Sequence, residues 1–233
     1  LVNLEFNLFQ SDIAMTHVTI SNSGSYTSGL HMLYSNPTLT DVTVNDNNNG
    51  GIVLISSNPT MTNMTISGNS STTYGGGIQM IQSNPTLING TISGNSSGRG
   101  GGIFVDNCTP ILTNVIITEN FTVEGYFPSR HGGGGMYITG GGSDVTMNNV
   151  MITDNSSHTN GGGVYTYGSI DLLMKNVTIT GNTAAWNGSE IYTEYTPADQ
   201  IVIINSIINN NSSDDNVHFY NCVEYSADMS YCN

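Results

Sequence analysis

The feature that most constrains the fold is a segment that the chain repeats along most of its length. Copies can be aligned on the Asn of "LINGTISGN", Leu87 to Asn95. The eight aligned positions are His17, Asp41, Asn63, Asn89, Asn114, Asn149, Asn176 and Asn205. They are separated by 24, 22, 26, 25, 35, 27 and 29 residues. A unit of this size cannot bury an apolar face alone, so the copies must stack on one another.

Each copy contains a stretch with the two-residue period of a half-buried β-strand. The residue two before the aligned position is always apolar: Met15, Leu39, Met61, Leu87, Leu112, Met147, Met174 and Ile203. The residue three after it is always β-branched: Ile20, Val44, Ile66, Ile92, Ile117, Ile152, Ile179 and Ile208. This alternation predicts strands with an apolar inner face, and no window has the period of a helix.

A second strand is expected after the glycine run of each copy. Its first inward residues are Leu30, Ile52, Ile78, Ile103, Met136, Val164, Ile191 and Val217. We expect a third short strand around the "NPT" segment, as at Asn84–Thr86.

Stacked copies of short strands predict an all-β fold, a single-stranded right-handed parallel β-helix of about eight coils. Like residues then form columns along the axis. An antiparallel sandwich predicts no such columns, and a propeller needs blades of about 40 residues. We therefore expect residues 1–233 to form one β-helix domain, as a piece of a longer secreted or surface protein. A long loop insertion, at about residues 119–135, accounts for the spacing of 35 residues between the aligned positions Asn114 and Asn149.

Two columns of polar residues are predicted to form hydrogen-bonded ladders. One is the column of aligned positions. The other contains Asn47, Asn69, Asn95, Asn120, Asn155, Asn182 and Asn211. Stacked amides can bind their equivalents in the coils above and below.

The composition restricts the partners. The chain has 3 Lys and Arg against 17 Asp and Glu, a formal net charge of -14, which excludes nucleic acid as a partner because phosphates would not be neutralised. No apolar run is long enough for a transmembrane segment. A surface rich in neutral polar residues favours an extracellular or cell-surface location. Cys222 and Cys232 could form a disulfide, or all three cysteines, with Cys108, could be thiols.

Two short motifs resemble those of polymorphic outer-membrane protein repeats. "GGGI" at Gly75–Ile78 and Gly100–Ile103 and "GGGV" at Gly161–Val164 are similar to the GGA[ILV] motif of that family. "ISGN" at Ile66–Asn69 and Ile92–Asn95, with its variants "ITEN", "ITDN" and "ITGN", is similar to FxxN with Ile in place of Phe. The resemblance implies a β-helix of a bacterial surface or autotransporter-type protein, many of which are adhesins.

Binding is the first function that we expect, through an outward aromatic face. The outward column between the inward residues of the second strand reads His31, Val53, Gln79, Phe104, Tyr137, Tyr165, Tyr192 and His218, and its neighbour contains Tyr167 and Tyr220. Tyr126, Arg130 and His131 of the inserted loop complete the candidate binding residues. Large exposed apolar faces usually mark interaction sites, so we expect this face to bind a glycan, a protein ligand or another domain of the parent chain. The rings could instead only stabilise the sheet.

A polysaccharide lyase or glycoside hydrolase on a pectate-lyase-like β-helix is the alternative function. A lyase needs a basic residue, but Arg99, Arg130 and Lys175 are expected at different corners. A hydrolase needs two nearby carboxylates, and no outward strand column offers them. We therefore predict no catalytic residues. No cofactor or metal site is predicted, although Asp- and Asn-rich turns such as 45–49 would suit calcium. Self-association through the uncovered ends of the β-helix is a further expectation.

Overall fold

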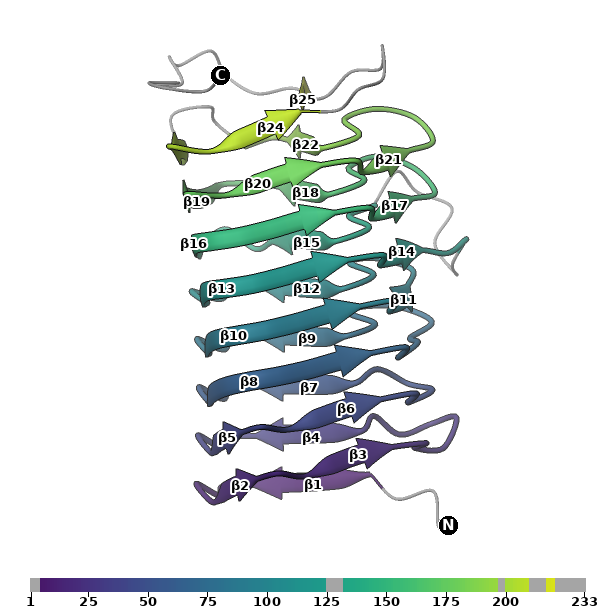
Figure 1. Cartoon of the computed structure of the whole chain (residues 1–233), viewed down its shortest axis with the longest axis vertical. Helices are drawn as coiled ribbons and strands as arrows, with labels where there is room; N and C mark the ends of the chain where they lie inside the picture. The colour runs from purple at the N-terminus through teal and green to yellow at the C-terminus, as the bar shows by residue number, and fades with distance from the viewer. Residues whose placement is uncertain (1–4, 125–131, 197–199, 210–216, 221–233) are drawn as a thin grey trace.

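The computed structural model describes residues 5–124, 132–196, 200–209 and 217–220, with the side chains of 218–220 left out. The chain winds into a stack of coils, with its N-terminal and C-terminal coils at opposite ends (Figure 1). Every strand pairing is parallel, and no described residue lies in an α-helix. The predicted parallel β-solenoid is thus confirmed.

Three parallel sheets run along the stack. The first sheet has nine strands: β1 (Phe6–Phe9), β4 (Leu30–Leu33), β7 (Ile52–Ile55), β9 (Ile78–Ile81), β12 (Ile103–Asp106), β15 (Met136–Thr139), β18 (Val164–Tyr167), β22 (Ile191–Glu194) and β25 (Val217–Tyr220). These strands include the second strand that was predicted after the glycine run of each copy. The outward column predicted from His31 to His218 has the pairing expected, for example Phe104 opposite Tyr137 and Tyr137 opposite Tyr165.

The second sheet contains the aligned segment of each copy. Its strands are β2 (Ala14–Thr16), β3 (Thr19–Ser21), β5 (Thr38–Thr40), β6 (Thr43–Asn45), β8 (Thr60–Ser67), β10 (Thr86–Ser93), β13 (Ile111–Thr118), β16 (Ser143–Thr153), β19 (Ile170–Lys175), β20 (Thr178–Thr180), β23 (Ile201–Ile204) and β24 (Ile207–Asn209). Ile66, Ile92 and Ile117 are partners in successive strands. They are fully buried, and their column lies in one apolar core with the inward residues of the first sheet.

The third sheet was not placed correctly from the sequence. It consists of β11 (Ser96–Ser97), β14 (Phe121–Thr122), β17 (Ser156–Ser157) and β21 (Thr183–Ala184), and it follows the second Asn column (Figure 1). The "NPT" segment instead forms the corner at which the second sheet begins, and its Thr is the first residue of β5, β8 and β10. β5 ends just before the aligned Asp41, and β8 and β10 run through the aligned Asn63 and Asn89, so the short "NPT" strand is part of the second sheet.

The aligned positions interrupt the extended backbone conformation of the second sheet. All eight have a positive φ between 49° and 55°, the left-handed conformation that Asn and Asp tolerate better than other side-chain-bearing residues. The exposed side-chain amides also form hydrogen bonds with their equivalents in the neighbouring coils. Asn89 Nδ2 donates to Asn63 Oδ1 at 3.2 Å, and Asn114 Nδ2 donates to Asn89 Oδ1 at 3.0 Å. Backbone conformation and side-chain pairing thus both favour Asn at this corner.

The second Asn column forms a buried ladder. Each Nδ2 group donates to the Oδ1 atom of the next rung, at 2.8–3.0 Å from Asn47 to Asn182. The same Oδ1 atom also accepts the backbone N–H of the preceding rung, as from Asn95 to Asn120 at 3.0 Å. Each Nδ2 group donates a second bond to a backbone carbonyl, such as Ile92 for Asn120 at 2.9 Å. The rungs have exposures of 0–1%, so the predicted ladder is confirmed over the described coils, while Asn211 lies outside them.

A third polar ladder, which the sequence reasoning missed, lies at the corner after the first sheet. Backbone N–H groups bind the hydroxyls of the next coil, from Ser35 to Ser57 and from Ser57 to Ser83, both at 3.0 Å. Cys108 is the next rung and accepts the Ser83 N–H through Sγ at 3.1 Å. Burial raises the pKa of this thiol, so it is a neutral structural group. Cys222 and Cys232 lie outside the described residues.

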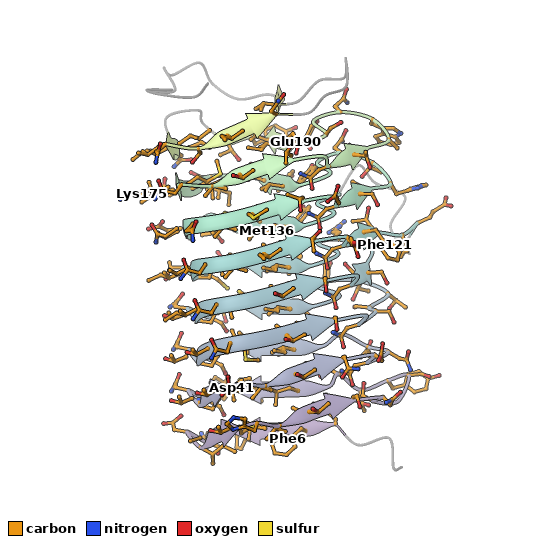
Figure 2. All side chains as sticks on the ribbon, viewed as in Figure 1. Phe6, Asp41, Phe121, Met136, Lys175 and Glu190 are labelled. Carbon is orange, nitrogen blue, oxygen red and sulfur yellow. The ribbon has the colours of Figure 1, made fainter. Side chains whose placement is uncertain are left out.

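The last described rung of the amide ladder, Asn182, donates to an acid. Glu190 occupies the position of the third glycine of "GGGI", and its carboxylate accepts the side-chain amide and the backbone N–H of Asn182. It lies near the C-terminal end of the stack (Figure 2). Its side chain is fully buried, and desolvation raises its pKa although Asn182 opposes that rise.

Glu190→Gln should therefore change how stability depends on pH. Because the folded-state pKa is raised, the favourable contribution of Glu190 is present at low pH and is lost as pH rises above the ordinary Glu pKa of about 4.3. Gln keeps an acceptor for Asn182 without this charge. We expect urea unfolding to show that the stability of the variant relative to the unmodified chain increases from pH 4 to pH 8. A constant or decreasing difference would contradict this origin of the pH dependence.

Candidate binding surface

Four aromatic residues of the predicted face form a continuous stack on the outside of the first sheet. Ring centroids are 5.5 Å apart for Phe104 and Tyr137, 4.9 Å for Tyr137 and Tyr165, and 5.1 Å for Tyr165 and Tyr192. Tyr74 extends the stack, with its centroid 4.5 Å from that of Phe104. The strand spacing of about 4.8 Å brings rings in one column to the separation at which aromatic pairs are favourable.

The prediction that these rings form an exposed platform is wrong. Phe104, Tyr137, Tyr165 and Tyr192 are only 0–5% exposed and form a cluster of their own, separate from the core. Stacking covers the faces of the rings, and the Tyr165 hydroxyl donates to the buried carboxylate of Glu194. The column was predicted correctly from the sequence, but periodicity does not show how much of each ring its neighbours cover.

Two phenol groups of the stack, those of Tyr137 and Tyr165, stay protonated at neutral pH. Desolvation raises the pKa of Tyr137, and the same effect with the hydrogen bond to Glu194 raises that of Tyr165. The two hydroxyls are therefore hydrogen-bond donors, not bases.

An open depression of about 350 Å³ lies where the stack reaches the surface. We call it the aromatic groove, and its main lining residues are Tyr74, Arg99, Phe104, Asp106, Tyr137 and Tyr167. The most accessible ring among them is Tyr167, which is 37% exposed, whereas Tyr74, Arg99 and Asp106 are half-buried. The groove thus presents ring surface together with one cation and one carboxylate.

Arg99, predicted in a glycine-rich turn, contacts the aromatic column, and this contact was not predicted. It does lie in the glycine-rich segment, but its guanidinium carbon is 5.6 Å from the centroid of Tyr74 and 6.0 Å from that of Tyr137. Contacts of this length are favourable cation–π interactions. Lys175 lies on the second sheet, exposed at the edge of the molecule (Figure 2).

Not all predicted binding residues belong to the described part of the chain. Tyr126, Arg130 and His131 lie outside the described residues, as do the side chains of His218 and Tyr220, although the backbone of β25 pairs with β22 in the expected register. The described part of the insertion contains Phe121, which pairs with Ser96 and Ser156 in the third sheet.

A second depression, of about 380 Å³, opens near the N-terminal end of the first sheet. We call it the N-terminal pocket, and the residues that bear on its chemistry are Glu5, Tyr26, His31, Asn49, Thr73 and Gln79. Gln79 also lines the aromatic groove, so the two depressions adjoin. His31 and Gln79 belong to the predicted outward column, but the pocket itself was not foreseen, because Glu5 and Tyr26 lie outside the repeated positions.

Within the described ranges, no three His, Cys, Asp or Glu side chains are placed to hold a metal ion. The same part of the chain has no helix long and apolar enough to cross a bilayer.

The architecture defines a parallel β-solenoid with two adjoining surface depressions. Comparison with known proteins gives the family: residues 7–150 match the model of the right-handed β-helix region. This match covers more than half of the 233 residues, and the chain belongs to the right-handed β-helix family. No curated protein and no solved structure matches the chain.

Proposed function

We propose that this protein is an extracellular or cell-surface β-helix that binds a carbohydrate in the aromatic groove. The observation that carries the proposal is the combination of accessible ring surface from Tyr74 and Tyr167 with the polar groups of Arg99 and Asp106 in one depression. Sugar binding sites need apolar surface for ring faces and a few oriented polar groups for hydroxyls. The resemblance to surface-protein repeats, many of them adhesins, supports the location and the adhesive role.

The charge of the molecule favours neutral over acidic glycans. The formal net charge is -14, and Asp106 places one of the negative charges in the groove itself. Arg99 is the only Lys or Arg among the described lining residues. A polyanionic chain would therefore meet a net repulsion that only one cation offsets.

Binding is supported over hydrolysis by the number of acids in the groove. Glycoside hydrolases use a pair of carboxyl groups on either side of the scissile bond. Asp106 is the only Asp or Glu among the described residues that line the aromatic groove. The high pKa of the Tyr137 phenol also argues against its use as a base. An assay for reducing ends and unsaturated products on the bound glycan would test the enzymatic alternative.

The residues that line the aromatic groove are those whose substitution should weaken glycan binding. Tyr74→Ala with Tyr167→Ala should reduce affinity at least tenfold for whichever neutral oligosaccharide an array identifies, because each ring face contributes roughly 1 kcal/mol. Arg99→Gln should also weaken binding. Calorimetric titration of the purified chain measures these changes.

Lys175→Gln is the control, because it changes an exposed cation on the second sheet. The buried rings of Tyr165 and Tyr192 are not suitable targets, since they do not line the groove. If no glycan on the array binds, or if the double tyrosine variant binds as well as the unmodified chain, the groove is not a carbohydrate site.

A further inference from the structure

We propose that the aromatic groove and the N-terminal pocket together bind one linear neutral polysaccharide, which lies along the axis of the β-helix and spans both depressions. This inference rests on the proposed carbohydrate function and extends it, because it specifies the length and the direction of the bound glycan. The observation that carries it is that Gln79 lines both depressions, so that they adjoin on the outside of the first sheet.

The two depressions extend along successive strands of the first sheet, from β1 to β18. Each of these strands has a lining residue within it or directly before it: Glu5, His31, Val53, Gln79, Phe104, Tyr137 and Tyr167. The strand spacing of about 4.8 Å makes this surface roughly 29 Å long from β1 to β18. Because an extended β-1,4-linked glycan advances by about one strand spacing per sugar residue, about six sugar residues fit along it.

Polar side chains in the N-terminal half of this surface have hydrogen-bonding groups that the described part of the protein does not use. Asn49, Thr73 and Gln79 line the N-terminal pocket and are half-buried, and their side chains form no hydrogen bond with any described residue. A side-chain amide offers donors and an acceptor, and a hydroxyl group is both donor and acceptor. These groups therefore suit a ligand that is rich in hydroxyl groups, as a sugar is.

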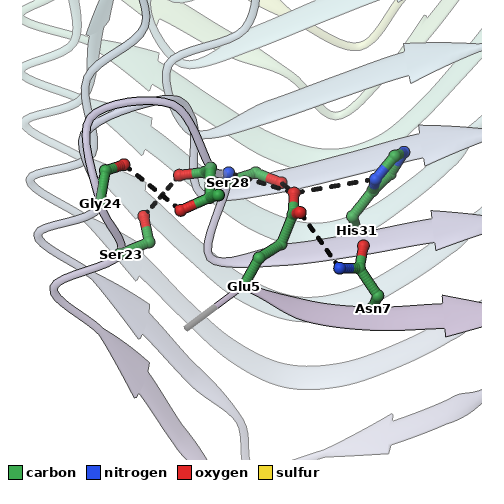
Figure 3. Close-up of polar contacts among 7 residues, drawn as sticks. Glu5, Asn7, Ser23, Gly24, Ser28 and His31 are labelled. Atoms are coloured by element: carbon green, nitrogen blue, oxygen red, sulfur yellow. Dashed lines mark hydrogen bonds and ion pairs between the residues drawn. The ribbon is translucent and has the colours of Figure 1, made fainter. Parts of the chain in front are cut away.

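The carboxylate of Glu5 is a fixed acceptor at the N-terminal end of the surface. Ser28 donates its hydroxyl to Oε1 at 2.7 Å and its backbone N–H to the same atom at 3.3 Å, and Asn7 Nδ2 donates to Oε2 at 3.1 Å (Figure 3). Oε2 thus keeps a lone pair for a hydroxyl group of the glycan. Tyr26, which is 94% exposed, adds a ring face to the same pocket. The N-terminal pocket therefore combines ring surface with oriented polar groups, as the aromatic groove does.

The two acids of the surface are too far apart to act as a hydrolytic pair. Asp106 is on β12 and Glu5 directly precedes β1, and the strand spacing places these strands roughly 19 Å apart. Glycoside hydrolases hold their two carboxyl groups about 5–9.5 Å apart. Among the described lining residues of both depressions, Arg99 is the only Lys or Arg. The surface is therefore suited to hold a neutral chain without cutting it.

The proposal is tested with two series of neutral β-1,4-linked oligosaccharides, of glucose and of mannose, from trimer to hexamer. Calorimetric titration of the full chain should show that the hexamer of the bound series has at least tenfold higher affinity than the trimer, because only the hexamer reaches both depressions. In NMR spectra the hexamer should shift the backbone amides of both Ser28 and Tyr167. Tyr26→Ala should weaken hexamer binding at least threefold and leave trimer binding unchanged, since the trimer is held in the aromatic groove.

Trp186→Ala is the matched control, because Trp186 is also an exposed ring, at 56%, and lines neither depression. It should leave the affinity for the hexamer unchanged. Equal affinity for trimer and hexamer, or a loss in Tyr26→Ala no larger than that in Trp186→Ala, would overturn the spanning chain but leave a short carbohydrate site in the aromatic groove. Absence of binding by both series would also overturn this proposal, whereas only an array without any bound glycan removes the carbohydrate site as well.

Discussion

Asn120→Ala is expected to lower the free energy of unfolding by about 4 kcal/mol, because it breaks the buried ladder in the middle of the stack. The Oδ1 atom of Asn120 accepts both the backbone N–H and the side-chain amide of Asn95, at 3.0 and 2.9 Å. Losing an acceptor for a buried donor costs roughly 1–3 kcal/mol each. The variant also leaves the Ile92 carbonyl without its 2.9 Å bond. Urea unfolding followed by circular dichroism measures the change.

Asn114→Ala, in the same coil, is the control for this prediction. Asn114 is exposed, and the hydrogen bond from its Nδ2 group to Asn89 Oδ1, at 3.0 Å, is open to solvent. Its φ of 55° is strained for Ala, which costs roughly 1–2 kcal/mol. The decrease in unfolding free energy for Asn114→Ala should therefore be about 1–2 kcal/mol, clearly smaller than that for Asn120→Ala. Equal losses at the two positions would show that burial of the ladder is not the source of its stability.

Gly101→Ala is expected to cost about 3 kcal/mol or more, because stacked coils leave no room for a methyl group at this corner. An added Cβ would lie 2.4 Å from the Phe121 carbonyl oxygen and 2.6 Å from that of Gly134. Both atoms belong to the backbone and cannot move without separating two coils. The bonds from Gly101 to Gly133 and from Gly102 to Gly134, both 3.1 Å, would then break. Loss of folded protein or a sharply lower unfolding midpoint is the expected result.

Gly141→Ala separates this steric effect from the general effect of replacing glycine. Gly141 lies in the turn after β15, and an added Cβ there would have no atom within 4 Å. Thermal unfolding of this variant should differ little from that of the unmodified chain. A comparable loss at Gly141 would mean that the crowded corner is not what requires glycine at position 101.

The columns could be predicted from the sequence because every coil repeats the same environment. Ile66, Ile92 and Ile117 could be aligned from spacing alone, and so could the rungs of the buried Asn ladder, since each repeat supplies an independent copy of the same pattern. The recurrence of Ser35, Ser57 and Ser83 before Asn-Pro is an equally clear sequence signal for the serine ladder.

The surface could be predicted less well, because it depends on residues that do not repeat. Arg99 reaches the rings from a glycine-rich segment whose equivalents carry no cation, so no column pointed to the groove. Glu5 and Tyr26 precede or interrupt the regular pattern and meet His31 only through the geometry of the first coils. The burial of Tyr165 follows from ring stacking and from Glu194. Periodicity shows which side of the sheet a ring is on but not what covers it.

The stacking of like residues in successive coils is most directly tested by methyl NMR of isoleucine-labelled protein. Cross-peaks are expected between the δ1 methyls of Ile66 and Ile92 and between those of Ile92 and Ile117, because partner strands are about 4.8 Å apart. The Ile66–Ile117 pair, two coils apart, should give a much weaker peak. Absence of both neighbouring cross-peaks, with each signal assigned by an Ile→Val variant, would contradict the coil-on-coil arrangement and with it both binding surfaces.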